Sequence, residues 1–183
     1  PEHTDNPDVS PERKLKIVRS LHRTNLLLGL YKQYIKVLTP LIKEVAAIRD
    51  RPVRLLELAS GSGEMAISLA RLATEKNLPV EVTGSDYVEN VVKDAEGEAV
   101  KRGLEMHFRT INAFDMRVLS QGEYDIILII GTMHHFTPGQ LAVIMAQSGK
   151  VAGSAFVGID GYRSMLTLVG LPTFHLITLL PDH

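Results

Sequence analysis

The chain contains no cysteine among its 183 residues. Without cysteine it can form no disulfide, thiolate nucleophile or cysteine-ligated zinc or iron–sulfur centre. Thiol redox chemistry is therefore excluded. A cysteine-free composition also suits a reducing compartment, so we expect a cytoplasmic protein.

Charge of one sign is not concentrated anywhere in the sequence. The 20 Lys and Arg residues nearly balance the 21 Asp and Glu residues, and the basic residues are scattered without forming a run. Nucleic acids and anionic membranes bind proteins through clustered basic residues. We therefore expect a small-molecule partner, with no nucleic acid and no membrane among the partners.

Long hydrophobic runs are also scarce. Residues 1–20 hold acids and prolines without an apolar stretch, so they do not resemble a secretory signal. Residues 164–180 are nearly uncharged, but Gly170 and Pro172 interrupt this segment, and it is short for a bilayer crossing. We predict no membrane span.

The first 50 residues carry a helical pattern. Apolar residues recur at helical spacing over 11–25 and again from Tyr31 to Ile48, with a break at Gly29 and an expected bend at Pro40. We predict an N-terminal helical extension over 1–50 and a main domain over 51–183. The extension either packs against this domain or forms a lid over its ligand.

From Pro52 onward, apolar strand patterns alternate with helical ones. A helix from 89 to 102 is expected to stop at Gly103, and Thr137 with Gln140 predicts a capping box that starts a helix ending near Ser148. The predicted strands are 53–58, 80–85, 106–111, 124–130 and 155–159. This alternation predicts an α/β fold with a doubly wound sheet of mostly parallel strands.

The most informative segment follows the first predicted strand. The strand ends at Glu57, and the chain turns through Gly61 and Gly63 into a helix. Glycine lets the backbone lie against a ligand, while the unpaired amides of the next helix face the same point. The segment therefore predicts a nucleotide-type binding loop.

The glycine spacing leaves more than one ligand open. It also fits the fingerprint of dinucleotide enzymes, with Asp86 near the distance at which those enzymes hold a ribose. Glu57 separates the options, because its negative charge would crowd a pyrophosphate but suits a ligand with an ammonium and a sulfonium. The loop therefore favours a cationic ligand.

These residues resemble the class I S-adenosylmethionine-dependent methyltransferases over about residues 53–163. The likeness lies in the segment from Glu57 to Gly63 and in Asp86 with Tyr87, and it continues in the segment 124–136 after the third strand. Asn112-Ala113 stands where the family commonly has Asp-Ala, and an amide can still accept the same hydrogen bond. The N-terminal helices and residues 160–164 more narrowly resemble an unassigned bacterial subgroup that acts on small molecules.

The resemblance implies a Rossmann-like fold, S-adenosyl-L-methionine as cofactor and methyl transfer to a small-molecule acceptor. In the family, the acid at the position of Asp86 accepts the ribose hydroxyls, and Tyr87 is placed to pack on the adenine. The cofactor-binding residues implied in this chain are Glu57, Ala59, Ser60, Gly61, Ser62, Gly63, Asp86, Tyr87, Asn112, Ala113, Ile130 and Gly131.

Methyl transfer needs mainly collinear positioning and exclusion of water, so no catalytic residue is obligatory. Where the acceptor must lose a proton, we expect His135 first and His134 second as the base, with Asp160 and Tyr162 nearby. Adjacent histidines are expected to point in different directions, so no metal site is predicted.

The family normally has seven strands, but only 23 residues follow Asp160 here, and they are strongly apolar. We therefore expect strands six and seven to be missing or truncated, and the apolar C-terminal segment to drive self-association. Two other functions stay open. One is a binding module that holds S-adenosylmethionine or S-adenosylhomocysteine without turnover, and the other is an NAD-dependent dehydrogenase.

Overall fold

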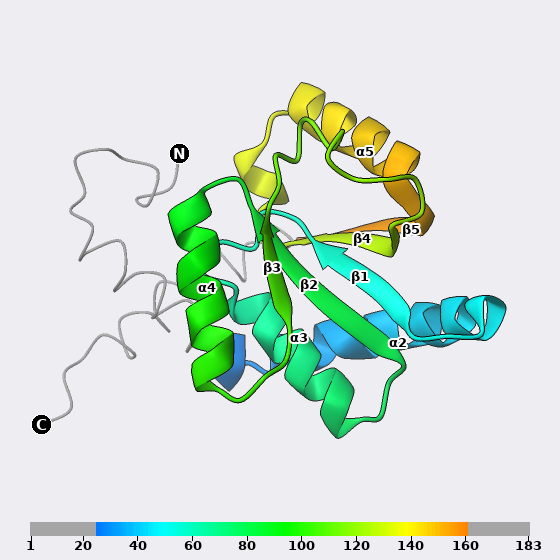
Figure 1. The fold of residues 1–183 in the computed structure, drawn as a ribbon, viewed down its shortest axis with the longest axis vertical. Coiled ribbons are helices and arrows are strands. Elements are labelled where there is room, and N and C mark those ends of the chain that lie inside the picture. The colour runs from blue at the N-terminus through cyan, green and yellow to red at the C-terminus, as the bar shows by residue number, and fades with distance from the viewer. Residues whose placement is uncertain (1–24, 161–183) are drawn as a thin grey trace, which may run out of the picture. The chain divides into compact units, whose positions relative to one another are not determined.

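Five parallel strands form the centre of the structure, a computed structural model that describes residues 25–160 (Figure 1). Neighbouring strands are parallel throughout, so their carboxyl ends meet at one edge of the sheet. The order in the sheet is β3 (His107–Thr110), β2 (Val80–Asp86), β1 (Val53–Glu57), β4 (Tyr124–Ile130) and β5 (Ala152–Ile159). This confirms the predicted α/β fold with a doubly wound sheet. The expectations for strands six and seven, for Tyr162 and for most of the segment 11–25 lie outside the described residues.

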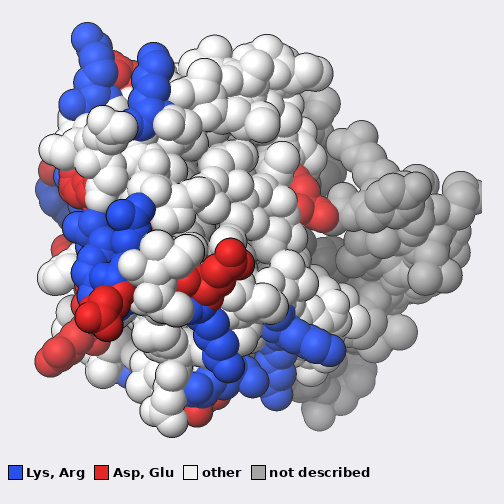
Figure 2. Space-filling view, turned by 90° about the vertical axis from the view of Figure 1, so that its right-hand side faces the viewer, with Lys and Arg blue, Asp and Glu red and all other residues white. Residues whose placement is uncertain are grey.

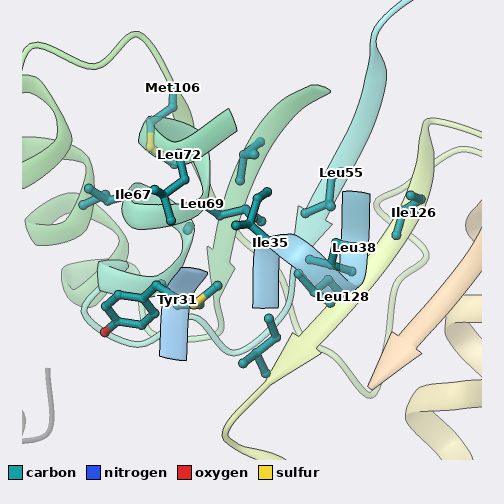
Figure 3. Close-up of a cluster of buried hydrophobic side chains, with 14 of the residues drawn as sticks. Tyr31, Ile35, Leu38, Leu55, Ile67, Leu69, Leu72, Met106, Ile126 and Leu128 are labelled. Carbon is teal, nitrogen blue, oxygen red and sulfur yellow. The ribbon is translucent and has the colours of Figure 1, made fainter. Parts of the chain in front are cut away.

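Helices cover both faces of the sheet. One face carries α2 (Leu30–Arg49), α3 (Glu64–Glu75) and α4 (Glu89–Lys101), and their apolar residues share one core with the inward residues of the strands (Figure 3). The other face carries α5 (Pro138–Val151), whose Ile144 and Val151 pack with Leu56 and Ile127. β4 is buried along its whole length because it lies between these layers.

The second predicted N-terminal helix is present as α2. Its buried residues are Tyr31, Ile35, Leu38, Ile42 and Val45, which follow the predicted stripe. The stripe ends earlier than predicted, because Ile48 is 75% exposed. α2 stays one continuous helix across Pro40. Since α2 shares its core with β1 and β4, it packs against the sheet, and a role as a separate lid stays a prediction.

The predicted helix ends are correct at two places and wrong at one. Gly103 has a φ of 69° after α4, and Thr137 with Gln140 forms the capping box of α5. The predicted end of the last helix near Ser148 is wrong, because α5 continues through Gly149 to Val151 and β5 begins at Ala152 rather than at Ala155. Glycine inside a helix costs about 1 kcal/mol, and the burial of Val151 outweighs that cost.

A buried carboxylate joins several elements at the amino edge of the sheet. Asp125 of β4 is 1% exposed and accepts two hydrogen bonds from the Arg51 guanidinium, at 2.7 and 2.9 Å. It also accepts the Arg54 amide of β1, at 2.9 Å, and Arg49 of α2 lies 3.5 Å away. Burial alone would raise the pKa of Asp125, but the bonds and charges of Arg51 and Arg54 hold it below its ordinary value. We name Asp125 with Arg49, Arg51 and Arg54 the arginine clamp.

Elsewhere the surface mixes charges of both signs. Figure 2 shows one face on which Lys and Arg side chains lie beside Asp and Glu, with uncharged surface between the groups. Within residues 25–160, no helix is both long enough and apolar enough to cross a bilayer.

Candidate functional site

The loop between β1 and α3 has the tight turns that its glycines predict. Ala59, Gly61 and Gly63 have φ values of 52°, 53° and 74°. A Cβ on Gly63 would lie 2.7 Å from the Phe108 ring and 2.8 Å from Ala95, so a side chain would push the loop off the sheet. A Cβ on Gly61 would meet no described atom within 4 Å. Gly63 therefore serves packing, whereas Gly61 leaves open space beside the loop.

Asp86 at the end of β2 is tied to this loop. Its Oδ2 accepts the Gly61 amide at 3.0 Å, and its Oδ1 accepts the Val88 amide at 3.0 Å. An ionised carboxylate has about four lone-pair positions, so each oxygen can accept a further hydrogen bond. The structure thus brings together the glycine loop and Asp86, which are 25 positions apart in the sequence.

A cleft of about 260 Å³ opens beside Asp86 at the carboxyl edge of the sheet. Phe114 and Phe136 meet edge to face in its wall, with ring centroids 5.7 Å apart. The lining residues are Ala59, Asp86, Tyr87, Ile111, Asn112, Ala113, Phe114 and Phe136. Larger hollows beside α5 and between α3 and α4 contain none of the predicted cofactor residues.

The cleft gathers five of the residues that the sequence singled out, namely Ala59, Asp86, Tyr87, Asn112 and Ala113. Asn112 is partly engaged, because its Oδ1 accepts the Phe114 amide at 2.9 Å. Three further residues line the cleft but were not predicted to do so, namely Ile111, Phe114 and Phe136. Ile111 and Phe114 could have been predicted from their position, because they flank Asn112-Ala113 directly.

Other predicted cofactor residues lie around the cleft without lining it. The Ser60 hydroxyl is buried with no hydrogen-bond partner in the described part of the chain. The Gly131 amide donates to Ile159 O at 2.9 Å, which fixes the end of β4 against β5. Ser62, Gly63 and Ile130 also lie outside the lining.

Glu57 lies at the end of β1 and is only 1% exposed. Its carboxyl accepts the Ala66 amide in the first turn of α3, and its Oε2 has no hydrogen-bond partner within residues 25–160. Burial raises the pKa of Glu57 to about 8, and the Ala66 bond opposes this only in part. The carboxyl group that was expected to carry a charge is therefore mostly protonated at neutral pH in this structure.

The two histidines follow β4 in a short turn of 3₁₀ helix, Met133–His135. The His134 amide donates to Asp160 Oδ2 at 2.8 Å, and its Nδ1 lies 3.0 Å from both oxygens of that carboxylate. The His135 ring lies against the His134 ring, with centroids 4.3 Å apart. The expectation that the two rings point in different directions is therefore wrong, because the tight turn holds them side by side with their planes 37° apart.

Asp160 also influences α2. Burial first, and the charge of Asp160 second, raise the pKa of Tyr34. The same carboxylate holds His134 through its backbone amide and its ring. Residues 25–160 contain no group of three or more acids or histidines placed to hold a metal ion.

The site can be tested against the group that the sequence motifs imply. Four buried side-chain oxygens have no hydrogen-bond partner among the described residues, and two of them, Glu57 Oε2 and Ser60 Oγ, belong to the glycine loop or the strand before it. The Asp86 carboxylate lines the cleft and can still accept further hydrogen bonds. These residues fit a ligand with hydroxyl and ammonium groups better than one with phosphates.

A parallel sheet with a glycine loop and a cleft at its carboxyl edge is the arrangement in which open α/β sheets bind their ligands. Residues 50–143 match a family model described as a methyltransferase domain. The chain belongs to this methyltransferase-domain family.

The chain is also similar to curated relatives and to solved structures. An uncharacterized protein of Mycobacterium tuberculosis is 30% identical over 169 residues, which cover 87% of this chain and 59% of the relative. A demethylmenaquinone methyltransferase of Thermus thermophilus is 28% identical over 110 residues, covering 57% of this chain and 48% of the relative. A crystal structure of a Pyrococcus horikoshii protein has a similar fold, with a TM-score of 0.51 and 22% identity over 70% of this chain and 57% of that one. This chain thus spans 59% of the length of its mycobacterial relative.

Proposed function

We propose that this chain binds S-adenosyl-L-methionine in the cleft beside Asp86 and transfers its methyl group to a small-molecule acceptor. The family match supports methyl transfer. The contact between Asp86 and the Gly61 amide carries the proposal for the ligand, because it places a ribose-type acceptor against a bare glycine loop. When bound, S-adenosylmethionine supplies an electrophilic methyl group.

The Glu57 carboxyl argues against the nicotinamide alternative. A pyrophosphate binds the free amides at a helix N-terminus. In this chain the Ala66 amide of the first turn of α3 already donates to Glu57. An anionic phosphate would have to displace this bond, which is unfavourable for NAD.

Different residues of the chain would have different roles in such a reaction. Asp86 holds the ribose hydroxyls, and the Phe114–Phe136 pair provides an apolar wall that excludes water. His134, held by Asp160, is the group placed to take a proton from an acceptor that must lose one. The hydrogen bonds from Asp160 support His134 in this role.

Calorimetry with the 183-residue chain tests the ligand first. We expect S-adenosylmethionine and S-adenosylhomocysteine to bind and NAD not to bind. Asp86→Asn should weaken binding by about 10- to 100-fold, because it removes a charged acceptor. Asp94→Asn on the exposed side of α4 is the matched control and should bind like the unchanged protein.

Turnover with candidate acceptors then tests the reaction. The proposal requires S-adenosylhomocysteine to accumulate with at least one acceptor. Binding without any turnover across hydroxyl, amine and acidic-carbon acceptors would favour a binding module. Binding of NAD in place of both adenosyl ligands would favour the dehydrogenase.

A further inference from the structure

Glu57 is a buried acid with an unsatisfied oxygen, and it precedes by two residues Ala59, which lines the proposed cofactor cleft. Val53 and Leu55 precede it at alternate positions of β1 and belong to the core under α2 and α3. The alternation of a strand places the Glu57 side chain on this same face. Its carboxyl has one amide donor, from Ala66, and its Oε2 has no hydrogen-bond partner in the described part of the chain.

No cation of the described elements balances this acid. The Lys and Arg residues of α2 are exposed, and its buried or half-buried titratable residues are Tyr31 and Tyr34. The start of α3 and the end of β2 add the acids Glu64 and Asp86, and no cation contributes to the pKa of Glu57. Glu64 is paired with Arg102 at 2.6 Å, and Asp86 accepts two loop amides. The acid of β4, Asp125, sits at the opposite end of its strand and is held by the arginine clamp. Burial therefore dominates, and it raises the pKa of Glu57 to about 8.

We propose that Glu57 releases its proton when a positively charged adenosyl ligand enters the neighbouring cleft, so that cofactor binding and deprotonation are coupled. This inference rests on the proposed function. Ala59, two residues after Glu57, lines the cleft. A positive charge within about 4–6 Å stabilises a carboxylate.

The coupled step moves a single proton and makes no covalent bond. The O–H bond of the Glu57 carboxyl breaks, the proton passes to the buffer, and the carboxylate remains opposite the ligand's cation. An uncharged ligand gives no such compensation, so it should leave the proton in place. Glu57 would thus distinguish the charged cofactor from uncharged adenosyl thioethers.

Calorimetry in buffers of different ionisation enthalpy measures the proton directly. For S-adenosylmethionine at pH 7, we expect the release of close to one proton per ligand bound, because the carboxyl is then mostly protonated in the free chain. The affinity should rise roughly tenfold from pH 6 to pH 7. For 5′-methylthioadenosine, which lacks both the ammonium and the sulfonium, we expect a binding heat that does not depend on the buffer.

Two variants complete the test. Glu57→Gln cannot ionise, so it should bind S-adenosylmethionine without proton release and with little change in affinity from pH 6 to pH 7. Glu64→Gln, on the first turn of α3, is the matched control and should still release the proton.

The outcomes separate this inference from the proposed function. A buffer-independent heat for S-adenosylmethionine with the unchanged protein overturns the coupling while leaving cofactor binding intact. Equal proton release with 5′-methylthioadenosine, or with Glu57→Gln, also overturns it. Failure of every adenosyl ligand to bind overturns the proposed function, and the coupling with it.

Discussion

At the scale of single residues, the buried carboxyl of Glu57 makes stability depend on pH. Its pKa is about 8 in the folded chain, against an ordinary value of 4.5. Between these values the native state holds a proton that the unfolded state has lost. The free energy of unfolding should therefore fall as the pH rises through this window, by at most about 1.4 kcal/mol per pH unit, and level off above pH 8.

Glu57→Gln tests this dependence, because the amide keeps the shape of the protonated acid and cannot ionise. We expect the variant to melt close to the unchanged protein near pH 4.5 and progressively above it as the pH approaches 8. Thermal unfolding at pH 5, 6, 7 and 8 measures the difference. A constant difference across this range would contradict the assignment.

The two adjacent histidines should differ in their effect on turnover. We expect His134→Gln to lower kcat by about 100- to 10,000-fold with an acceptor that must lose a proton, because it removes the ring held by Asp160. His135→Gln is the matched control and should lower kcat far less. Both variants should bind S-adenosylhomocysteine like the unchanged protein.

Added imidazole should partly restore turnover to His134→Ala if the ring acts as a base. Equal losses in the two glutamine variants, or no response to imidazole, would mean that His134 only orders the turn.

The sequence predicted where these residues lie along the strands, but it did not predict what surrounds them in the fold. Glu57 was placed at a strand end by a local pattern of apolar residues and glycines. Its burial could not be read in that way, because it depends on α2 and α3 closing over the strand. Asp160 was expected near the two histidines, but its hydrogen bonds to His134 could not be predicted from the sequence, because they depend on the pairing of β4 with β5.

At the scale of secondary-structure elements, the capping box at the start of α5 is a test of local stabilisation. The Thr137 hydroxyl accepts the Gln140 amide, and Gln140 Oε1 accepts the Thr137 amide at 2.8 Å. Thr137→Ala should lower the free energy of unfolding by about 1 kcal/mol. Chemical denaturation measures this change.

Thr74→Ala is the control for that substitution. The Thr74 hydroxyl only returns a bond to Ala70 O within α3, an arrangement that gives helices little stability. The control should therefore unfold near the unchanged midpoint. A loss as large as that of Thr137→Ala would indicate that threonine itself, rather than the cap, is responsible.

The start or end of a helix was predictable where one residue determines it locally, either through a side chain that accepts a backbone amide or through a glycine with positive φ. Thr137 and Gly103 are such cases, because each acts on the residues next to it. The end of α5 was not predictable from Gly149, since Val151 is held in the helix by burial against the sheet. The prediction that Ile48 belongs to the buried stripe was wrong for the converse reason, because the core under α2 stops before the end of the helix.

At the scale of the whole molecule, the arginine clamp links residues that are far apart in the sequence. Asp125 joins Arg51 and Arg54 across more than 70 positions, and Arg49 also donates to Gly153 O of β5 at 2.6 Å. Asp125→Asn should lower the free energy of unfolding by roughly 2–4 kcal/mol, because it leaves the clustered guanidinium groups without their buried anion. Denaturation monitored by circular dichroism measures this loss.

Asp115→Asn provides the comparison at an exposed position. Asp115 pairs with Arg117 at 2.6 Å on the surface, where solvent weakens the attraction. Its unfolding midpoint should barely change. If the two aspartate variants unfold alike, the clamp does not hold the amino edge together.

The position of β1 in the sheet has a consequence for synthesis of the chain. β1 pairs with β2 at Val53 and Val80, but its other edge pairs with β4 through Leu55 and Ile126. A nascent polypeptide that has left the ribosome only as far as β3 therefore presents one open edge of its central strand. Until translation delivers β4, that edge is the place where a chaperone would protect the chain or a neighbouring polypeptide would add to it.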